Sequence, residues 1–411
     1  MSECRVPVIN IQSDWNEALR KIMGECWVSC KFRDQPGVHG KIKNEGVLKG
    51  EPYYVPASNS FAVGSSSSFT ITIIHTPSNH KCVFVAPCKA FTGLHRKAVV
   101  SVDVAAGGLG ISVCAENKLI VWDTRMGLTR RLLSAHVGDV YKCRFFPSGV
   151  VVLSGGADMQ LKIWSAETGQ CPVTLVGHTA AIMDVCVVER GRNIVSVSKD
   201  GTARLWDCGQ SACLATLVRR NVAVNCCTLM AVGERLDEGE PQEPPSEREV
   251  GTKGKVLILG YEDGTVEGIA VRSRRSVFRS ALSSAVNCVA VLSDDNFVVG
   301  CQNGQVLLFG VQNTLTPTKT WFESNSPVLS LLTLYEGFLV GRADGLCTFH
   351  SLPSAGADSF RIALTGSDCD PIYDMACDGS HIFTACRDSV IRKYDVQNIK
   401  ASLRDERNGP S

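Results

Sequence analysis

Histidine, serine and aspartate recur together at a fixed spacing in the middle of this 411-residue sequence. These three residue types form the catalytic triad of many hydrolases, in which the histidine activates the serine. Here they form two complete sets, 42 residues apart: His136, Ser154 and Asp158, then His178, Ser196 and Asp200. An active site needs one such set, whereas a structural unit repeats its own. We therefore interpret both sets as structural, and we expect no catalytic residue in this chain.

A tryptophan follows each set at the same distance. Trp164 stands ten residues after Ser154, and Trp206 stands ten residues after Ser196. A buried indole N–H requires an acceptor, and a buried His–Asp pair is stable only when it is fully hydrogen-bonded. We therefore expect the aspartate of each set to orient its histidine, and the histidine to connect through the serine to the indole.

The interval between the tryptophans defines a repeat that runs through most of the chain. Trp122, Trp164 and Trp206 are successively 42 residues apart, and the last of them closes a unit that Gly177-His178 opens. A period of about 40 to 45 residues with these marks is typical of WD repeats. Degenerate copies follow, with other residues in the tryptophan position: Ile269, Phe309, His350 and Tyr394.

Each degenerate copy keeps a turn six residues before its tryptophan position. These turns are Asp263-Gly264, Asn303-Gly304, Asp344-Gly345 and Asp388-Ser389. Asp-Gly and Asn-Gly join adjacent antiparallel strands because they tolerate a positive φ. Together with the three units that carry tryptophan, these four copies give seven repeat units. The sequence therefore predicts an all-β fold, a seven-bladed WD40 β-propeller over residues 81–398.

The two ends of the chain predict how this ring is flanked and closed. Residues 1–80 are expected to form a small α+β domain, with a helix over 11–24 whose apolar face carries Trp15 and Ile22. No strand is expected after Tyr394, so residues 81–94 are expected to supply the outer strand of the last blade. The charged residues 399–411 are expected to be a disordered tail.

An insertion lengthens the fourth unit. Residues 234–254 are acidic and rich in proline, without apolar periodicity, which predicts a disordered loop. Loops of this length within a compact domain are usually functional or disordered. The sequence leaves open whether this one is a tolerated insertion or a functional segment.

Composition excludes several classes of partner and cofactor. The formal net charge is +1, and no apolar stretch is long enough to span a membrane, so we expect neither a nucleic acid nor a membrane as a partner. The nineteen cysteines are odd in number and include no Cys-x-x-Cys pair. Together with an N-terminus that has no signal pattern, they predict reduced thiols rather than disulfides or a metal site. We expect no cofactor, a monomer, and a cytoplasmic location, with the nucleus as an open alternative.

Several motifs outside the general repeat pattern resemble a known family. The chain is similar to the proteasomal ATPase-associated factors over nearly its whole length. The resemblance is carried by the stretches that begin at Ile11, Arg144, Val151, Leu161, Asp200, Pro245 and Asp368. It implies a soluble chaperone of proteasome assembly that binds ATPase subunits of the regulatory-particle base. Such a protein would contact chiefly their C-terminal domains and would restrain their association with the core particle.

The candidate contact residues lie where the loops that carry the histidines and the turn aspartates share one face of a propeller. They are Asp139, Tyr141, Lys199, Glu262, Asp368, Asp370 and Arg387. The four carboxylates predict a partner that presents basic residues. The alternative is a substrate receptor or scaffold of a ubiquitin ligase, which would require an arginine cluster at the same mouth. Lys199 and Arg387 supply only a sparse set of cations for that role.

Overall fold

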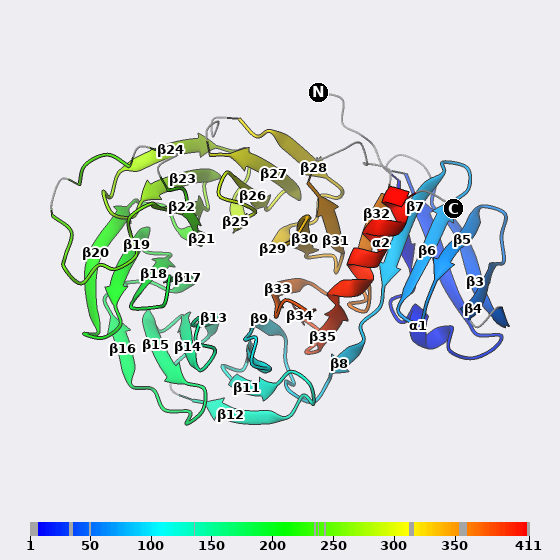
Figure 1. The fold of residues 1–411 in the computed structure, drawn as a ribbon, viewed down its shortest axis with the longest axis horizontal. Coiled ribbons are helices and arrows are strands. Elements are labelled where there is room, and N and C mark those ends of the chain that lie inside the picture. Colours follow the sequence, from blue (N-terminus) through cyan, green and yellow to red (C-terminus); the bar gives the residue numbers. More distant parts are fainter. Residues whose placement is uncertain are drawn as a thin grey trace.

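The computed structural model describes residues 7–32, 36–48, 51–134, 136–233, 236, 238–241, 244–311, 316–352 and 360–408. Seven sheets stand in a ring around a central axis, which confirms the predicted WD40 β-propeller (Figure 1). In blades 1 to 6 the first strand in sequence is innermost, and in blade 7 the innermost strand is β33 (Ile372–Cys377). Within the described part of the chain, no helix is long and apolar enough to span a membrane.

Blades 1 to 5 are four-stranded antiparallel sheets built from consecutive strands. Blade 1 comprises β9 (Val99–Val104), β10 (Leu109–Cys114), β11 (Leu119–Asp123) and β12 (Thr129–Leu133). Blade 2 comprises β13 (Val140–Phe145), β14 (Val151–Gly156), β15 (Gln160–Ser165) and β16 (Val173–Val176). Blade 3 comprises β17 (Ile182–Val188), β18 (Asn193–Ser198), β19 (Thr202–Asp207) and β20 (Ala212–Arg219). Blade 4 comprises β21 (Val224–Ala231), β22 (Lys255–Tyr261), β23 (Thr265–Ala270) and β24 (Ser276–Ala281). Blade 5 comprises β25 (Val286–Val291), β26 (Asn296–Cys301), β27 (Gln305–Gly310) and β28 (Lys319–Phe322).

The last two blades recruit strands from the N-terminal part of the chain. Blade 6 comprises β29 (Val328–Leu334), β30 (Gly337–Arg342), β31 (Cys347–Ser351) and β32 (Phe360–Leu364). Blade 7 contains β33 (Ile372–Cys377), β34 (His381–Cys386) and β35 (Ile391–Asp395), and β8 (Lys89–Phe91) adds its fourth strand by pairing antiparallel with β35. The segment predicted to close the ring, 81–94, is thus divided, because β7 (His80–Val85) pairs parallel with β32 of blade 6.

The N-terminal strands form two sheets that share one core. One sheet contains β1 (Val8–Ile11), β2 (Glu25–Lys31), β3 (Val38–Leu48) and β4 (Glu51–Pro56). The other contains β5 (Phe61–Ser66), β6 (Thr70–His75) and β7, and it continues into blade 6 as a seven-stranded sheet. Trp15 is fully buried between the sheets, and its indole donates a hydrogen bond of 3.1 Å to Thr365 Oγ1, just after β32. The unit is therefore continuous with the propeller in both backbone pairing and core packing.

The two helices differ from the sequence prediction. The helix expected over 11–24 is limited to α1 (Trp15–Ala18), because residues 8–11 form β1. Trp15 and Leu19 are buried as expected, but Ile22 is 72% exposed. The chain then turns sharply, and a Cβ at Gly24 would lie 2.1 Å from the carbonyl oxygen of Ala18, so only glycine fits there.

The C-terminal residues 399–408, predicted as a disordered tail, belong to helix α2 (Val396–Asn408). Val396, Ile399 and Leu403 recur at helical spacing and pack against the core of blades 6 and 7. The sequence prediction was wrong because it weighed the charges of this segment and overlooked a short apolar stripe. The final three residues, 409–411, lie outside the described part of the chain.

Both predicted histidine sets form hydrogen-bonded connections inside their blades. His136 Nδ1 donates to Asp158 at 2.8 Å, its Nε2 lies 2.7 Å from Ser154 Oγ, and Trp164 Nε1 donates to the same hydroxyl at 2.8 Å. The second set, His178, Asp200, Ser196 and Trp206, repeats these distances. Burial lowers the pKa of both histidines despite the neighbouring carboxylates, so the rings are neutral at pH 7.

The other blades are held with fewer polar contacts. In blade 1, His95 reaches Ser112 at 2.6 Å, but its Nδ1 has no hydrogen-bond partner among the described residues. Glu116, in the place of the aspartate, instead forms an ion pair of 3.0 Å with Lys118. In blade 5, Phe297 stacks on Phe309 of the same blade and on Phe278 of blade 4. Aromatic packing therefore replaces the hydrogen-bonded set in this degenerate unit.

The acidic insertion differs from its prediction, because much of it is docked on the propeller. Residues 244–254 lie against blades 3 and 4, where Arg248 pairs with the buried carboxylate of Asp207, and Glu249 pairs with Arg274. The backbone N–H of Val250 donates to Asn193 Oδ1 at 2.7 Å. Sequence reasoning missed this docking because the residues that pair with Arg248 and Glu249 lie in other parts of the chain. Residues 234, 235, 237, 242 and 243 of the insertion lie outside the described part.

The shared core predicts that the N-terminal unit and the propeller unfold together. Trp15→Ala is expected to lower the free energy of unfolding by about 3 to 5 kcal/mol, because a large buried ring and its hydrogen bond are lost. Calorimetry should still show one transition at a lower temperature. Trp27→Ala is the matched control, with a ring 46% exposed and an expected cost below about 1 kcal/mol. An early separate transition that leaves the main one in place would contradict this coupling.

The docked insertion predicts a local change in protease sensitivity. Asp207→Asn should speed tryptic cleavage after Arg248 several-fold, because the guanidinium loses the carboxylate that holds the segment on blade 3. Mass spectrometry of timed digests measures this rate. Asp123→Asn is the control, since Asp123 occupies the same repeat position in blade 1 but pairs with Arg130 at 2.8 Å. Equal cleavage after Arg248 in the wild type and both variants would show that the ion pair does not retain the segment.

Candidate functional site: the mouth of the propeller channel

Every innermost strand contains one extra residue at the same end of the channel. In each blade the register between the first and second strands shifts by one residue, so that one residue of the innermost strand has no partner. These seven unpaired residues are Val100, Tyr141, Met183, Asn225, Asn287, Leu329 and Tyr373. A β-bulge redirects the side chain of the extra residue. The seven bulges therefore form a ring of half-buried side chains, which we call the bulge ring.

The bulge ring surrounds the mouth of the central channel. Six of its members, all except Tyr141, line a cavity of about 410 Å³ together with Lys199 and Glu262. The lining therefore combines apolar and aromatic groups with two amides and one charge of each sign. A surface of this kind suits a protein partner, because such interfaces use an apolar centre with polar groups around it.

The two charged lining residues stand on tight turns between the second and third strands of their blades. The backbone N–H of Lys199 donates to Ala181 at 2.9 Å, and that of Glu262 donates to Ala223 at 3.1 Å. Both turns contain a glycine with positive φ, at Gly201 and Gly264, which L side chains rarely adopt. The repeated turn therefore places the residue before each turn aspartate at the channel mouth.

The structure brings part of the predicted contact set together. Lys199 and Glu262 line the mouth, and Tyr141 belongs to the bulge ring. Arg387 Nε donates to Asp370 at 2.7 Å, so these two opposite charges largely neutralise each other. The remaining two residues, Asp139 and Asp368, are exposed on the loops that precede blades 2 and 7.

A charged cluster that the sequence did not predict lies one residue deeper in the channel. Asp374 follows the bulge of blade 7 and is buried, with Lys142 Nζ 3.2 Å from each of its oxygens and Arg144 at 3.2 Å. Ser101 Oγ and the backbone N–H of Val102 also donate to it, at 2.7 and 3.2 Å. Burial alone would raise the pKa of Asp374, but Arg144 and Lys142 outweigh it and hold the pKa at about 2.

The same pattern of bonds connects neighbouring blades around part of the channel. Ser101 Oγ accepts from the backbone N–H of Cys143 at 3.2 Å, and a carboxylate oxygen of Asp184 accepts from that of Cys227 at 3.0 Å. In both cases a side chain of one innermost strand accepts a hydrogen bond from a backbone N–H of the innermost strand in the next blade. Sequence reasoning could have found this network only by aligning the residue after each bulge, because the set varies from blade to blade.

The innermost strands of blades 4 and 5 carry cysteines in place of a charged residue at this level of the channel. Cys226 and Cys288 stand at the position that Asp374 occupies in blade 7, and burial raises the pKa of both thiols well above the usual range. Protonated thiols are weak nucleophiles and poor metal ligands. Among the described residues, no group of three histidine, cysteine, aspartate or glutamate side chains is arranged to hold a metal ion.

Asp374 predicts a specific acid sensitivity. Its pKa in the folded protein lies below the ordinary value near 4, so the ionised group adds stability above about pH 4, and this contribution disappears as the pH falls toward 2. Asp374→Asn should lower the free energy of unfolding at pH 7 by about 2 kcal/mol or more and should flatten its pH dependence over that window. Denaturant titrations at several pH values test this. The exposed Asp139→Asn serves as control, and an unchanged acid profile for Asp374→Asn would contradict the assignment.

Comparison with known proteins agrees with the repeat geometry. The family model "WD domain, G-beta repeat" matches residues 127–165 and 169–207, which correspond to the two units with complete histidine sets. Curated proteins called proteasomal ATPase-associated factor 1 match 95% of this chain. The relative from Gallus gallus is 44% identical and that from Homo sapiens is 42% identical, and 99% of each is covered. A "probable" member from Dictyostelium discoideum is 34% identical over 96% of its length.

The agreement thus extends from the N-terminal unit through all seven blades and is not limited to the common repeat. Two relatives above 40% identity align over 95% of this chain, so the aligned region includes both the N-terminal unit and the propeller. This chain belongs to the proteasomal ATPase-associated factor 1 family of WD-repeat proteins.

Proposed function

We propose that this chain is a non-catalytic assembly factor that binds ATPase subunits of the proteasome regulatory-particle base, chiefly through their C-terminal domains. It would restrain those subunits from associating with the core particle, acting as a monomer in the cytoplasm, and the nucleus remains an alternative location. The observation that carries the proposal is the full-length similarity to relatives named for association with proteasomal ATPases. The geometry of the channel mouth supports it with a surface suited to a protein domain.

The proposed contact surface is the bulge ring and the loops around it. Tyr141 and Tyr373 supply aromatic groups that commonly anchor protein interfaces. Asp139, Glu262 and Asp368 are exposed carboxylates on this face. The partner domain would therefore present lysines or arginines opposite them. Complementary charges of this kind mainly raise the association rate and sharpen specificity.

The pairing of Arg387 argues against the ubiquitin-ligase alternative. A receptor for a phosphate or an acidic motif requires a cluster of available arginines. Arg387 forms an ion pair with Asp370, and Lys199 shares the mouth cavity with Glu262. The cations at the mouth are therefore balanced by neighbouring carboxylates. The assembly factor is the function that the site supports best.

Binding to the purified C-terminal domain of each base ATPase subunit tests the proposal. The wild-type chain should bind at least one of them, and affinity should fall as salt is raised, because salt screens the charges. The double variant Asp139→Lys, Glu262→Lys should weaken binding about tenfold or more, with an unchanged melting temperature. Glu167→Lys is the matched control, since Glu167 is exposed on a turn at the opposite ends of the strands. Calorimetry or surface-based kinetics measures each affinity.

Two outcomes would contradict different parts of the proposal. Binding that is unaffected by salt and by the double variant would exclude the channel mouth as the contact surface. The proposed partner, an ATPase subunit, would still hold. Failure to bind any of the ATPase domains would overturn the proposed function itself.

A further inference from the structure

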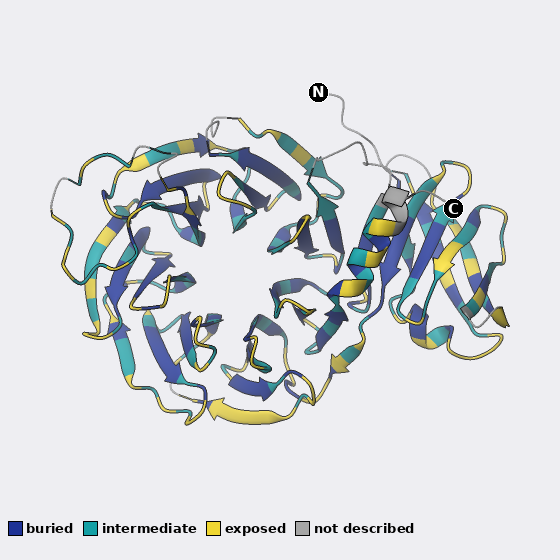
Figure 2. Cartoon of the chain, viewed as in Figure 1, coloured by how far each residue is buried: buried dark blue, intermediate teal, exposed yellow. Residues whose placement is uncertain are grey.

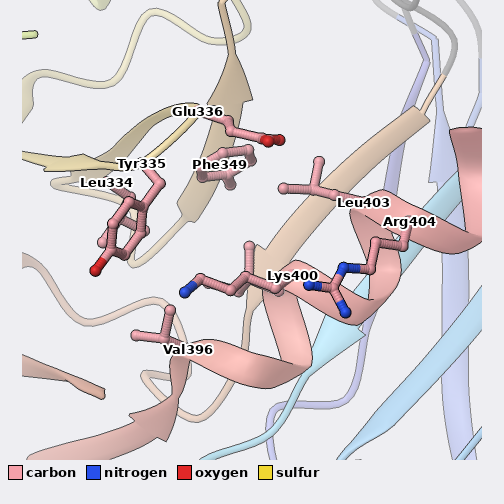
Figure 3. A pocket seen from close by; sticks show the side chains of 9 residues that line it. Leu334, Tyr335, Glu336, Phe349, Val396, Lys400, Leu403 and Arg404 are labelled. Atoms are coloured by element: carbon pink, nitrogen blue, oxygen red, sulfur yellow. The ribbon is translucent and has the colours of Figure 1, made fainter. Parts of the chain in front are cut away.

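A second candidate binding site lies on the face of the propeller opposite the channel mouth, between blade 6 and helix α2. The turn between β29 and β30 forms one wall, and successive turns of the helix form the other (Figure 3). The space between them has a volume of about 280 Å³. Small-molecule pockets usually measure about 300 to 1,000 Å³, so this groove stands at the small end of that range and has room for one large side chain.

The floor of the groove is apolar and rigid. Phe349, Val396 and Ile399 line it, and each is at least nine-tenths buried because it also packs in the core of blades 6 and 7. Leu334 and Leu403 line the sides and are only partly buried. A side chain that entered the groove would therefore gain apolar contact without requiring the blade to rearrange.

An exposed tyrosine stands at the edge of the groove. The ring of Tyr335 is 77% exposed, which makes it the second most exposed of the large apolar side chains recorded for the described residues. Its ring is covered on one face by the ammonium group of Lys400, 4.1 Å from the centroid. The contact orients the aromatic ring beside the opening, and aromatic groups with few rotatable bonds are effective anchors in interfaces.

The charges of the rim indicate what the occupant carries. Lys400 and Arg404 stand one helical turn apart on α2 and both line the groove, whereas Glu336 lies across from them on the blade side (Figure 3). The helix side of the opening is therefore cationic next to an apolar floor. A carboxylate that follows an inserted side chain would meet these two cations.

From the volume, the apolar floor and the cationic wall, we propose that this groove binds an acidic linear segment of a partner protein. The segment inserts one large apolar side chain between blade 6 and α2, and its aspartate or glutamate side chains pair with Lys400 and Arg404. The site lies at the ends of the blade 6 strands opposite the channel mouth, and it shares no lining residue with the mouth cavity. It is therefore independent of the proposed contact with the ATPase subunits, and both surfaces could be occupied together.

Fluorescence anisotropy with a short labelled peptide tests this inference. The probe has one phenylalanine flanked by aspartates, and its C-terminus is amidated so that no terminal carboxylate contributes. We expect it to bind the full-length chain, and we expect an otherwise identical peptide with asparagines in place of the aspartates to bind about tenfold more weakly. The same loss is expected for the double variant Lys400→Glu, Arg404→Glu.

Two further variants separate binding from folding. Arg96→Glu with Lys97→Glu makes the same charge change at exposed positions elsewhere and should leave the affinity for the peptide unaltered. Tyr335→Ala removes an exposed ring that cannot be essential for the core, so it should weaken binding several-fold without changing the melting temperature. The inference would be overturned by a peptide that does not bind, by equal affinity for the acidic and neutral peptides, or by binding that requires a free C-terminal carboxylate.

Discussion

The propeller depends on hydrogen bonds between innermost strands that do not pair with one another. Each blade is a separate sheet, so the backbone groups on the channel side of its first strand have no neighbouring strand to satisfy them. Buried backbone groups without partners are costly, and here side chains of one blade supply partners to the next. Asp374, Ser101 and Asp184 accept from backbone N–H groups of the following blades. The hub is therefore a set of polar bonds between blades as well as an apolar core.

The bulge ring follows from the same constraint. A strand that must approach the axis closely and still pair with its own blade takes one extra residue where it enters the channel, and this turns one side chain per blade toward the mouth. The structural requirement of the hub thus produces the surface that is available for a partner. The most polar part of the hub, around Asp374, lies directly beneath that surface.

The N-terminal part of the chain contributes to two blades, and not only to the blade that closes the ring. β8 completes blade 7, while β7 joins the N-terminal strands to blade 6 through parallel pairing. The connection is reinforced by Trp15, whose indole bonds to Thr365, 350 residues away in the sequence. An edge that would otherwise be exposed on blade 6 is covered, which removes a site for unwanted strand pairing. Outer edges elsewhere remain open, and β12 is exposed along most of its length (Figure 2).

Local sequence determined the number of blades and the contents of the two best ones, because those features repeat at one period and one register. His136, Ser154 and Trp164 could be connected from spacing alone, since a buried indole and imidazole each require a partner. The positions of Lys199 and Glu262 at the mouth follow from the same repeat, because each residue stands directly before a turn that is copied from blade to blade. What repeats in the sequence could be predicted.

Tertiary structure alone decided the features that join residues without a repeat between them. The ion pair of Arg248 with Asp207 docks a segment whose composition predicts disorder, and the burial of Ile399 orders a tail whose charges suggest the same. The cluster at Asp374 draws on three blades, and its buried carboxylate is stabilised by Lys142 and Arg144 of blade 2 and by Ser101 of blade 1. Composition measures the average tendency of a segment to remain solvated. Whether that segment has a complementary surface to bind depends on residues that only the closed ring brings within reach.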